Sequence, residues 1–216
     1  MTEIEKQIQL YLVTDEAACL GRDFFWVVEE AVKGGVTMVQ LREKNLGTRA
    51  FIEKGKRLKA LLDHYHVSLI INDRVDVAMA INAAGVHVGQ SDMHFKMLKD
   101  MLPTDKILGI SAEKQSDVVE AEDWKISYLA ASPLFATPSK TDTEKPWGME
   151  GLKWVKTNSR HPIVVIGGLN ADNTAEAIAC GAGGIAVISA ICSVPSPFDA
   201  AQNLKAIITG QVNSHI

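Results

Sequence analysis

Short apolar segments alternate with amphipathic segments along almost the whole chain. The apolar segments are rich in strand-forming residues and end in polar or turn-forming ones, which predicts eight strands at 9–14, 38–42, 68–71, 85–89, 107–111, 128–132, 163–167 and 184–189. Helical spacing of apolar residues predicts helices at 24–33, 48–66 and 75–83, from near 93, and at 114–122, 149–158, 171–180 and 197–209. Strands and helices are therefore expected to alternate from one end of the chain to the other.

Two fold classes fit eight strand–helix units, a closed barrel and a doubly wound open sheet. Segments 85–89, 163–167 and 184–189 are nearly uninterrupted apolar runs, as expected for strands of a parallel sheet that is buried on both faces. The units are compact and regularly spaced, and no G-x-G-x-x-G follows the first predicted strand, which favours the barrel. We therefore predict an α/β protein with a (βα)8 TIM barrel that forms a single domain over residues 1–216.

Composition and charge argue against nucleic-acid and membrane partners. The chain has 47% hydrophobic and 22% charged residues, which is ordinary for a globular domain, and its net charge of -4 argues against a nucleic-acid binder. No apolar run is long enough to span a membrane, and the first residues have no signal-peptide pattern, so a cytoplasmic location is expected. Cys19, Cys180 and Cys192 are far apart and in no metal-ligand spacing, which suits reduced thiols. A homo-oligomer is compatible with the sequence.

Polar residues gather at the ends of the predicted strands. In a TIM barrel the carboxyl ends of the strands form the mouth where the active site lies. The residues at these ends are Thr14 and Asp15; Gln40, Arg42 and Lys44; Asn72 and Asp73; Gln90 to Asp92; Ser111; Thr137 to Lys140; Gly167 and Gly168; and Ser189. We expect them to converge on one mouth.

The second predicted strand ends in an alternating polar set. Gln40, Arg42 and Lys44 are separated by Leu41 and Glu43, so in an extended segment their three side chains point the same way. An amide, a guanidinium and an ammonium on one face suit the binding of a pyrophosphate. The alternative is a polar strand face that is paired with neighbouring carboxylates.

Two aspartates follow neighbouring strands. Asp73 and Asp92 each lie just past an apolar strand and could meet across the barrel mouth, where a carboxylate pair beside a phosphate suits Mg²⁺. Zinc is not expected, because the clusters of Cys or His that it needs are missing. The alternative for both aspartates is helix capping, by Asp73 before Arg74 and by Asp92 before a helix beginning near Met93.

Phosphate-binding candidates follow the last three strands. Gly167-Gly168 and Ile188-Ser189 occupy the places where barrels often bind phosphate through backbone amides. The loop after strand 128–132 carries hydrogen-bond donors between three prolines, namely Thr137, Ser139, Lys140 and Thr141, although ordinary solvated loops share this composition. By contrast, His87 lies within an apolar strand and is predicted to be a satisfied interior histidine.

Six segments in this order carry a resemblance to a known family. They are Gln40-Leu41-Arg42-Glu43-Lys44, Ile71-Asn72-Asp73-Arg74-Val75-Asp76, Gly85-Val86-His87-Val88-Gly89-Gln90-Ser91-Asp92, Thr137-Pro138-Ser139-Lys140, Ile166-Gly167-Gly168 and Val187-Ile188-Ser189-Ala190. Together they resemble thiamine-phosphate synthases over nearly the whole chain. The resemblance implies a (βα)8 barrel that joins a hydroxymethylpyrimidine diphosphate to a thiazole phosphate and releases pyrophosphate.

The resemblance also implies roles for individual residues. The pyrimidine diphosphate would be held by Gln40, Arg42, Lys44, Asn72, Ser111 and Lys140, the Mg²⁺ by Asp73 and Asp92, and the thiazole phosphate by Thr137, Ser139, Gly168, Ile188 and Ser189. Arg42, Lys44 and Lys140 would act in catalysis by stabilising the leaving group, a chemistry that needs no protein nucleophile.

Two departures from the family pattern affect substrate detail more than reaction class. Glu113 stands where family members often have histidine, and Ala130-Ala131-Ser132 stands where a glycine commonly precedes the proline. Two other functions are considered. One is a sister enzyme of the same fold that isomerises the thiazole phosphate, and the other is a phosphate-binding barrel without catalysis. An isomerase needs a general acid or base at the mouth, but it would not require the aspartate pair or the cationic set.

Overall fold

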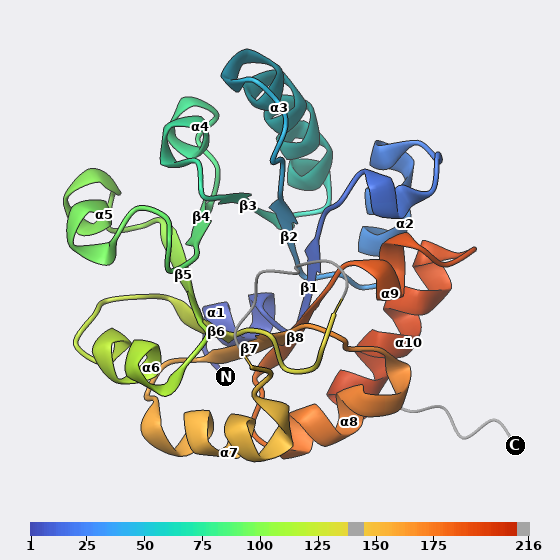
Figure 1. Cartoon of the computed structure of the whole chain (residues 1–216). Coiled ribbons are helices and arrows are strands. Elements are labelled where there is room, and N and C mark those ends of the chain that lie inside the picture. The colour runs from blue at the N-terminus through green and yellow to red at the C-terminus, as the bar shows by residue number, and fades with distance from the viewer. Residues whose placement is uncertain (138–144, 211–216) are drawn as a thin grey trace, which may run out of the picture.

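Eight parallel strands close into a barrel in the order of the chain, as the computed structural model shows (Figure 1). The structure describes residues 1–137 and 145–210. The strands are β1 (Leu10–Val13), β2 (Met38–Leu41), β3 (Ser68–Asn72), β4 (Gly85–Val88), β5 (Ile107–Ala112), β6 (Tyr128–Ala131), β7 (Ile163–Ile166) and β8 (Gly184–Val187). The predicted (βα)8 barrel is confirmed, because β1 pairs with both β2 and β8.

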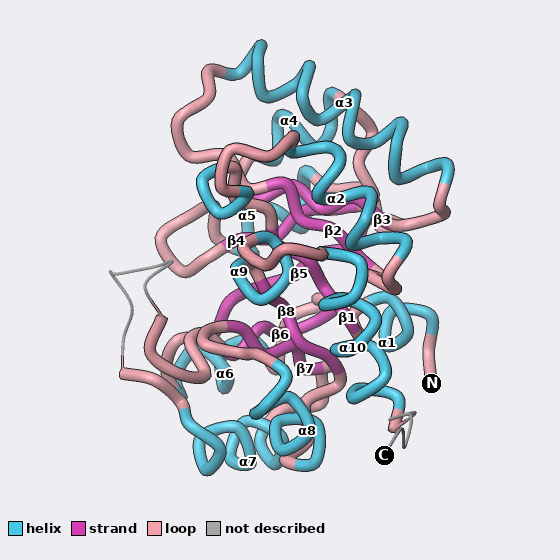
Figure 2. Tube along the Cα trace, turned by 90° about the vertical axis from the view of Figure 1, so that its right-hand side faces the viewer, coloured by secondary structure: helices cyan, strands magenta, loops and turns pink. Residues whose placement is uncertain are grey.

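Helices alternate with the strands, and most of them surround the barrel, whereas α1 lies at its centre behind the strands in Figure 1 (see also Figure 2). They are α1 (Glu3–Gln7), α2 (Phe24–Lys33), α3 (Thr48–His64), α4 (Val75–Ala80), α5 (Phe95–Met101), α6 (Gln115–Ala121), α7 (Gly148–Asn158), α8 (Ala171–Ala179), α9 (Ser189–Cys192) and α10 (Pro197–Thr209), with a 3-10 turn η1 (Ala17–Cys19). The sequence pattern missed α1, α9 and η1, because elements this short show no helical period.

Helix boundaries follow local backbone chemistry. Helix α2 begins as predicted, since the Asp23 carboxylate accepts a hydrogen bond of 2.8 Å from the Trp26 backbone N–H. Helices α3 and α4 end two to three residues before their predicted ends. His66 and Asn82 have left-handed backbones, with φ of 56° and 50°, which an α-helix does not allow.

The closed sheet separates two cores. The larger core lies between the strands and the surrounding helices. The smaller one fills the barrel interior with the residue that follows α1 and with residues at alternate strand positions, namely Ile8, Tyr11, Val13, Met38, Ile70, Tyr128, Ala130, Val164 and Ala186. Towards the carboxyl ends of the strands, the inward positions become polar, as at Gln40, Asn72, His87 and Ser111. The interior is therefore apolar at the end where the strands begin, and at the other end it combines these polar side chains with apolar ones such as Val13 and Val164.

The remaining sequence expectations concern thiols and membranes. The three cysteines are free, as predicted, and Cys19 and Cys192 are buried. Within residues 1–137 and 145–210, no helix has the length and apolar character needed to cross a membrane.

Close approach of neighbouring strands explains one interior glycine. A Cβ built on Gly85 would lie 1.9 Å from the backbone oxygen of Ile107, so a side chain there would push β4 away from β5. We expect Gly85→Ala to lower the free energy of unfolding by about 2–3 kcal/mol, the usual cost of overpacking. Urea denaturation measures this change. As a control, Gly47→Ala should change stability by less than about 1 kcal/mol, because a Cβ on Gly47 has no heavy atom within 4 Å.

Candidate active site

A cavity of about 470 Å³ opens at the carboxyl ends of the strands. Every site residue predicted from the sequence that lies in the described part of the chain lines it: Gln40, Arg42, Lys44, Asn72, Asp73, Asp92, Ser111, Thr137, Gly168, Ile188 and Ser189. Ser139, Lys140 and Thr141 lie outside the described residues, so their roles stay predictions. The expected convergence on one mouth is confirmed for the described residues, although Thr14 and Asp15, at the same end of the barrel, do not line the cavity itself.

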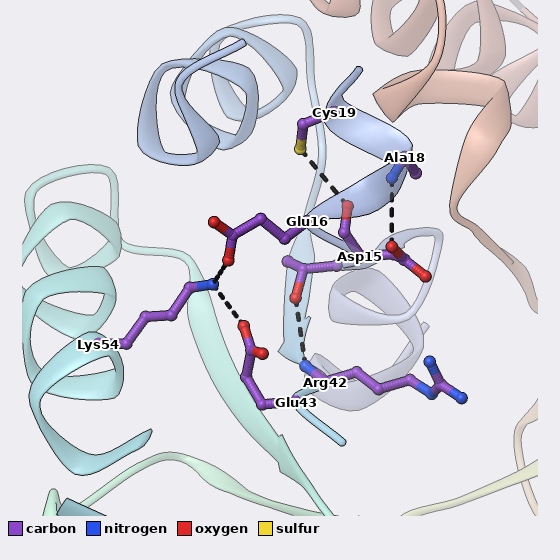
Figure 3. A network of polar contacts seen from close by, with 8 residues as sticks. Asp15, Glu16, Ala18, Cys19, Arg42, Glu43 and Lys54 are labelled. Carbon is purple, nitrogen blue, oxygen red and sulfur yellow. Dashed lines mark hydrogen bonds and ion pairs between the residues drawn. The ribbon is translucent and has the colours of Figure 1, made fainter. Parts of the chain in front are cut away.

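The end of β2 divides its side chains between two sides. Gln40, Arg42 and Lys44 line the cavity, whereas Glu43 points away and is ion-paired with Lys54 of α3 (Figure 3). Lys54 is also paired with Glu16 and lies 4.0 Å from the centroid of the Phe24 ring. Because Lys54 neutralises Glu43 outside the cavity, the positive charge of Arg42 stays available inside it.

The alternative that the cations after β2 are paired with neighbouring carboxylates is correct only for Lys44. The ammonium of Lys44 lies 2.6 Å from Oδ2 of Asp73. No carboxylate within the described residues forms an ion pair with Arg42, whose guanidinium extends away from Lys54 in Figure 3. Arg42 is therefore the described cation best placed to meet a substrate anion.

Thr14 and Asp15 support the mouth without lining it. The Thr14 hydroxyl accepts a hydrogen bond of 3.2 Å from the Arg42 backbone N–H, and the Thr14 N–H donates to the Gln40 carbonyl at 2.9 Å. The Asp15 carboxylate accepts from the Ala18 N–H at the start of η1 (Figure 3). Both residues lie at the mouth end of β1, as predicted, but neither is among the residues that line the cavity.

Asp73 and Asp92 meet at the cavity wall. Their carboxyl groups lie within hydrogen-bonding reach of each other, and Oδ2 of Asp92 also accepts from the Gly89 N–H at 2.8 Å. Asp73 has a left-handed backbone, with φ of 59°, and its N–H donates to the His87 carbonyl at 2.8 Å. A non-glycine residue in this region is strained, and such strain is typical of functional sites.

Neither aspartate caps a helix. The N-cap of α4 is Arg74, which makes no side-chain cap, and the N-cap of α5 is His94, whose ring accepts from the Lys96 N–H. The capping alternative is therefore wrong for both aspartates. Their approach across two neighbouring strands is a tertiary feature that the local sequence pattern does not reveal.

The shared site moves the pKa values of the two aspartates in opposite directions. Burial, followed by the hydrogen bond with Asp73, raises the pKa of Asp92 to about 6. Burial also opposes ionisation of Asp73, but the hydrogen bond with Asp92 and the ammonium of Lys44 outweigh it and lower the pKa of Asp73. Below about pH 6 the two close carboxyl groups therefore share one proton, and a cation could take its place.

Close packing of the β6–α7 loop explains the pair of glycines after β7. Gly167 and Gly168 have left-handed backbones, with φ of 106° and 66°. A Cβ on either would lie 2.8 Å from a side-chain carbon of the β6–α7 loop, Pro133 Cβ or Phe135 Cβ respectively. The pair therefore lets the loop from β6 come close to the strand end, in addition to leaving backbone exposed to the cavity.

Sequence reasoning missed four polar residues that line the cavity: Tyr11, His87, Glu113 and Ser132. Tyr11 is inward-facing, one alternate position before Val13, but its apolar strand context hid its hydroxyl. His87 is buried and hydrogen-bonded, as predicted, yet it also contributes to the cavity wall. Strand periodicity with the correct register could have placed both residues inside the barrel.

The raised pKa of Asp92 predicts how the free energy of unfolding of the metal-free protein depends on pH. An unfolded aspartate ionises near pH 3.9, so folding favours protonated Asp92. That stabilisation is fully present below about pH 4 and is lost as the pH rises through about 6. Asp73, whose pKa is lowered, acts only at lower pH. We expect the free energy of unfolding of Asp92→Asn, relative to wild type, to rise between pH 4 and 6 in urea titrations with chelator. Parallel pH curves would contradict this expectation.

Comparison with known proteins gives one family. A family model described as thiamine monophosphate synthase matches residues 10–191. The thiamine-phosphate synthase of Albidiferax ferrireducens is 47% identical over 201 residues, which cover 93% of this chain and 92% of that protein. The thiamine-phosphate synthase of Vibrio campbellii is 46% identical over 203 residues, which cover 93% of this chain and 98% of that protein. A solved structure of a thiamine phosphate pyrophosphorylase from Pyrococcus furiosus matches with a TM-score of 0.89 and 34% identity, covering 97% of this chain and 100% of that one. The chain therefore belongs to the thiamine monophosphate synthase family.

Proposed function

We propose that this protein is a thiamine-phosphate synthase that couples a hydroxymethylpyrimidine diphosphate with a thiazole phosphate. In this reaction the ring nitrogen of the thiazole forms a C–N bond with the pyrimidine methylene carbon. The C–O bond to the diphosphate breaks, and its electron pair leaves with pyrophosphate. Family membership and the activity named for close relatives support this proposal.

One observation carries the proposal at the level of the site. A single cavity contains the Asp73–Asp92 pair on one wall and the Arg42 and Lys44 cations beside it. A diphosphate that leaves with its bonding electrons gains negative charge in the transition state. Preorganised cations stabilise that charge more strongly in a partly buried site than in water. The cavity is therefore suited to a reaction whose leaving group is a pyrophosphate.

The donor set of the aspartate pair fits Mg²⁺. No group of three or more His, Cys, Asp or Glu side chains that could hold a metal gathers within the residues that the structure describes. Mg²⁺ usually takes one or two protein carboxylates and completes its shell with water and substrate phosphates, so Asp73 and Asp92 would suffice to hold it. When bound there, Mg²⁺ would neutralise charge on the diphosphate.

Each cation has a distinct local partner. Lys44 is paired with Asp73, so it links the cationic set to the aspartates and can orient the Asp73 carboxylate. Arg42 has no such pairing among described side chains, and its planar guanidinium can bind two phosphate oxygens at once. We assign Arg42 to the leaving pyrophosphate and Lys44 to both the diphosphate and the aspartate pair.

The substrate class and the cellular location predicted from the sequence belong to this proposal. The substrates are small phosphorylated molecules, and the protein acts in the cytoplasm. Cys19, Cys180 and Cys192 form no disulfide in the structure, and none of the three lines the cavity. The chemistry needs no thiol nucleophile.

The role of Arg42 predicts a large and selective loss of turnover. Arg42→Ala should lower kcat for coupling about a hundredfold, the typical effect of removing a charge-stabilising donor. The measurement is pyrophosphate release with both substrates present. Arg160→Ala is the matched control and should keep wild-type turnover. Arg160 precedes β7 at the opposite end of the barrel and lies 3.9 Å from Glu122.

The same assay distinguishes coupling from isomerisation. A synthase releases pyrophosphate only when both substrates are present, whereas an isomerase interconverts thiazole phosphate isomers without a diphosphate. If the wild-type protein releases no pyrophosphate with both substrates yet interconverts the isomers, the synthase proposal is wrong.

The aspartate pair predicts how activity depends on Mg²⁺. Asp73→Asn and Asp92→Asn should each lower activity at limiting Mg²⁺ by at least about tenfold, which is roughly 1.4 kcal/mol of transition-state stabilisation. Titrating Mg²⁺ in the pyrophosphate-release assay measures this change. Asp63→Asn should match wild type, because Asp63 pairs with Lys59 near the far end of α3. Wild-type activity of both site variants at limiting Mg²⁺ would remove the pair from the metal site.

A further inference from the structure

A chain of four hydrogen bonds crosses the barrel interior beneath the cavity. The Gln40 amide donates to the Tyr11 hydroxyl at 2.9 Å, and the hydroxyls of Tyr11 and Tyr128 are 3.0 Å apart. The Tyr128 hydroxyl lies 3.0 Å from Nδ1 of His87, and Nε2 of His87 lies 2.9 Å from the Ser111 hydroxyl. The chain thus joins Gln40 on β2 to Ser111 on β5, two cavity residues on different walls.

Tyr128 is the central member of this chain and is the one member that does not line the cavity. Its side chain is fully buried. Its ring stacks on His87 at 5.6 Å and 16°, and it meets Tyr11 edge-on at 5.9 Å and 86°. Gly109 leaves room for the ring, since a Cβ there would lie 2.1 Å from Cζ of Tyr128. The position of the Tyr128 hydroxyl is therefore fixed by its surroundings.

The chain has a direction that starts at Gln40. An amide nitrogen can only donate, so the Tyr11 oxygen accepts and the Tyr11 hydrogen needs an acceptor. The Tyr128 oxygen is the acceptor that the structure places beside it. Tyr128 then donates to Nδ1 of His87, and the remaining Nε2–H donates to the Ser111 oxygen. The Ser111 hydrogen is left to point into the cavity.

Other proton arrangements cost energy or require a different site. If His87 donated from Nδ1 to Tyr128 while Gln40 kept its orientation, one buried tyrosine hydrogen would lose its acceptor. An unsatisfied buried donor costs about 1–3 kcal/mol. Burial also raises the pKa of both tyrosines, so neither is ionised. If all four hydrogen bonds ran in the opposite direction, every group would be satisfied only after a flip of the Gln40 side-chain amide. The Gln40 NH₂ would then face the cavity, and the Ser111 hydroxyl would donate to His87 instead of to the cavity.

We propose that Tyr128 is a positioning residue that fixes the hydrogen-bond polarity of the pyrimidine-binding walls. Through this chain the Gln40 carbonyl faces the cavity as an acceptor, and the Ser111 hydroxyl faces it as a donor. The walls then suit a ring that carries an N–H donor on one side and an acceptor on the other, and they disfavour the reverse pattern. The identity of the ligand in this inference rests on the proposed function, whereas the donor and acceptor roles of Gln40 and Ser111 follow from the hydrogen bonds alone.

The tautomer of His87 tests the polarity without any substrate. In protein labelled with ¹⁵N-histidine, long-range ¹H–¹⁵N spectra distinguish the two neutral tautomers and the imidazolium. His87→Gln identifies the His87 signals among the six histidines. We expect the Nε2–H tautomer in the wild type and a mixture of tautomers in Tyr128→Phe, which lacks the hydroxyl that donates to Nδ1. An Nδ1–H tautomer or an imidazolium in the wild type overturns the proposal.

Steady-state kinetics test the consequence for binding. In Tyr128→Phe, the KM for the pyrimidine diphosphate should rise about tenfold, the value of one well-placed hydrogen bond, while the KM for the thiazole phosphate stays within about twofold. Tyr65→Phe is the matched control, because its hydroxyl donates to Glu29 at 2.7 Å outside the barrel, and it should leave both KM values unchanged. An unchanged pyrimidine KM in Tyr128→Phe overturns the positioning role. A wild-type protein that releases no pyrophosphate contradicts the proposed function instead, and the tautomer measurement still decides the polarity.

Discussion

The alternation of side chains along a closed parallel sheet is the constraint on which this structure depends. Once eight strands close into a barrel, every second residue must point into a space too narrow for water to fill freely. At the end where the strands begin, Ile8, Met38 and Ile70 fill that space with apolar atoms. At the other end several inward positions hold polar side chains beside the apolar Val13 and Val164, and the buried polar groups are hydrogen-bonded to one another inside the barrel. The catalytic mouth is thus built on a layer of paired polar groups.

Charge around the mouth is distributed by the same alternation. Glu43 follows Arg42 directly, yet the pleat of β2 sends it outward to Lys54, while Arg42 stays in the cavity. The carboxylates that do enter the cavity come from other strand ends, Asp73 after β3 and Asp92 after β4. The result is a cavity in which Lys44 is paired with Asp73, whereas Arg42 forms no ion pair with a carboxylate of the described residues, because its neighbour Glu43 faces outward.

The polar layer below the mouth also limits what the cavity can bind. The side chains of Gln40 and Ser111 are restrained, because Gln40 is hydrogen-bonded to Tyr11 and Ser111 is hydrogen-bonded to His87. In a buried chain of hydrogen bonds, the donor and acceptor roles of one group determine those of the next, so the arrangement at one end determines the arrangement at the other. The hydrogen-bonding groups that two cavity walls present are in this way set by the barrel interior as well as by Gln40 and Ser111 themselves.

The sequence by itself determined the fold and the residues of the mouth. Strand and helix periods placed all eight strands, because burial on both faces leaves a clear apolar signal, and the polar residues at the strand ends followed from the barrel geometry. The alternation after Met38 also correctly separated Arg42 from Glu43. Local signals failed at α1, η1 and α9, which are too short for a period to show.

Only the tertiary structure decided what each polar residue contacts. Asp73 and Asp92 could have capped helices, and nothing in the local pattern distinguishes a capping carboxylate from one that meets a partner across neighbouring strands. Thr14 and Asp15 end a strand like their neighbours, but backbone contacts keep them outside the cavity. The link from Tyr11 through Tyr128 to His87 joins residues up to 117 positions apart. Such contacts depend on strand register and on the empty space at Gly109, and these are fixed only when the barrel closes.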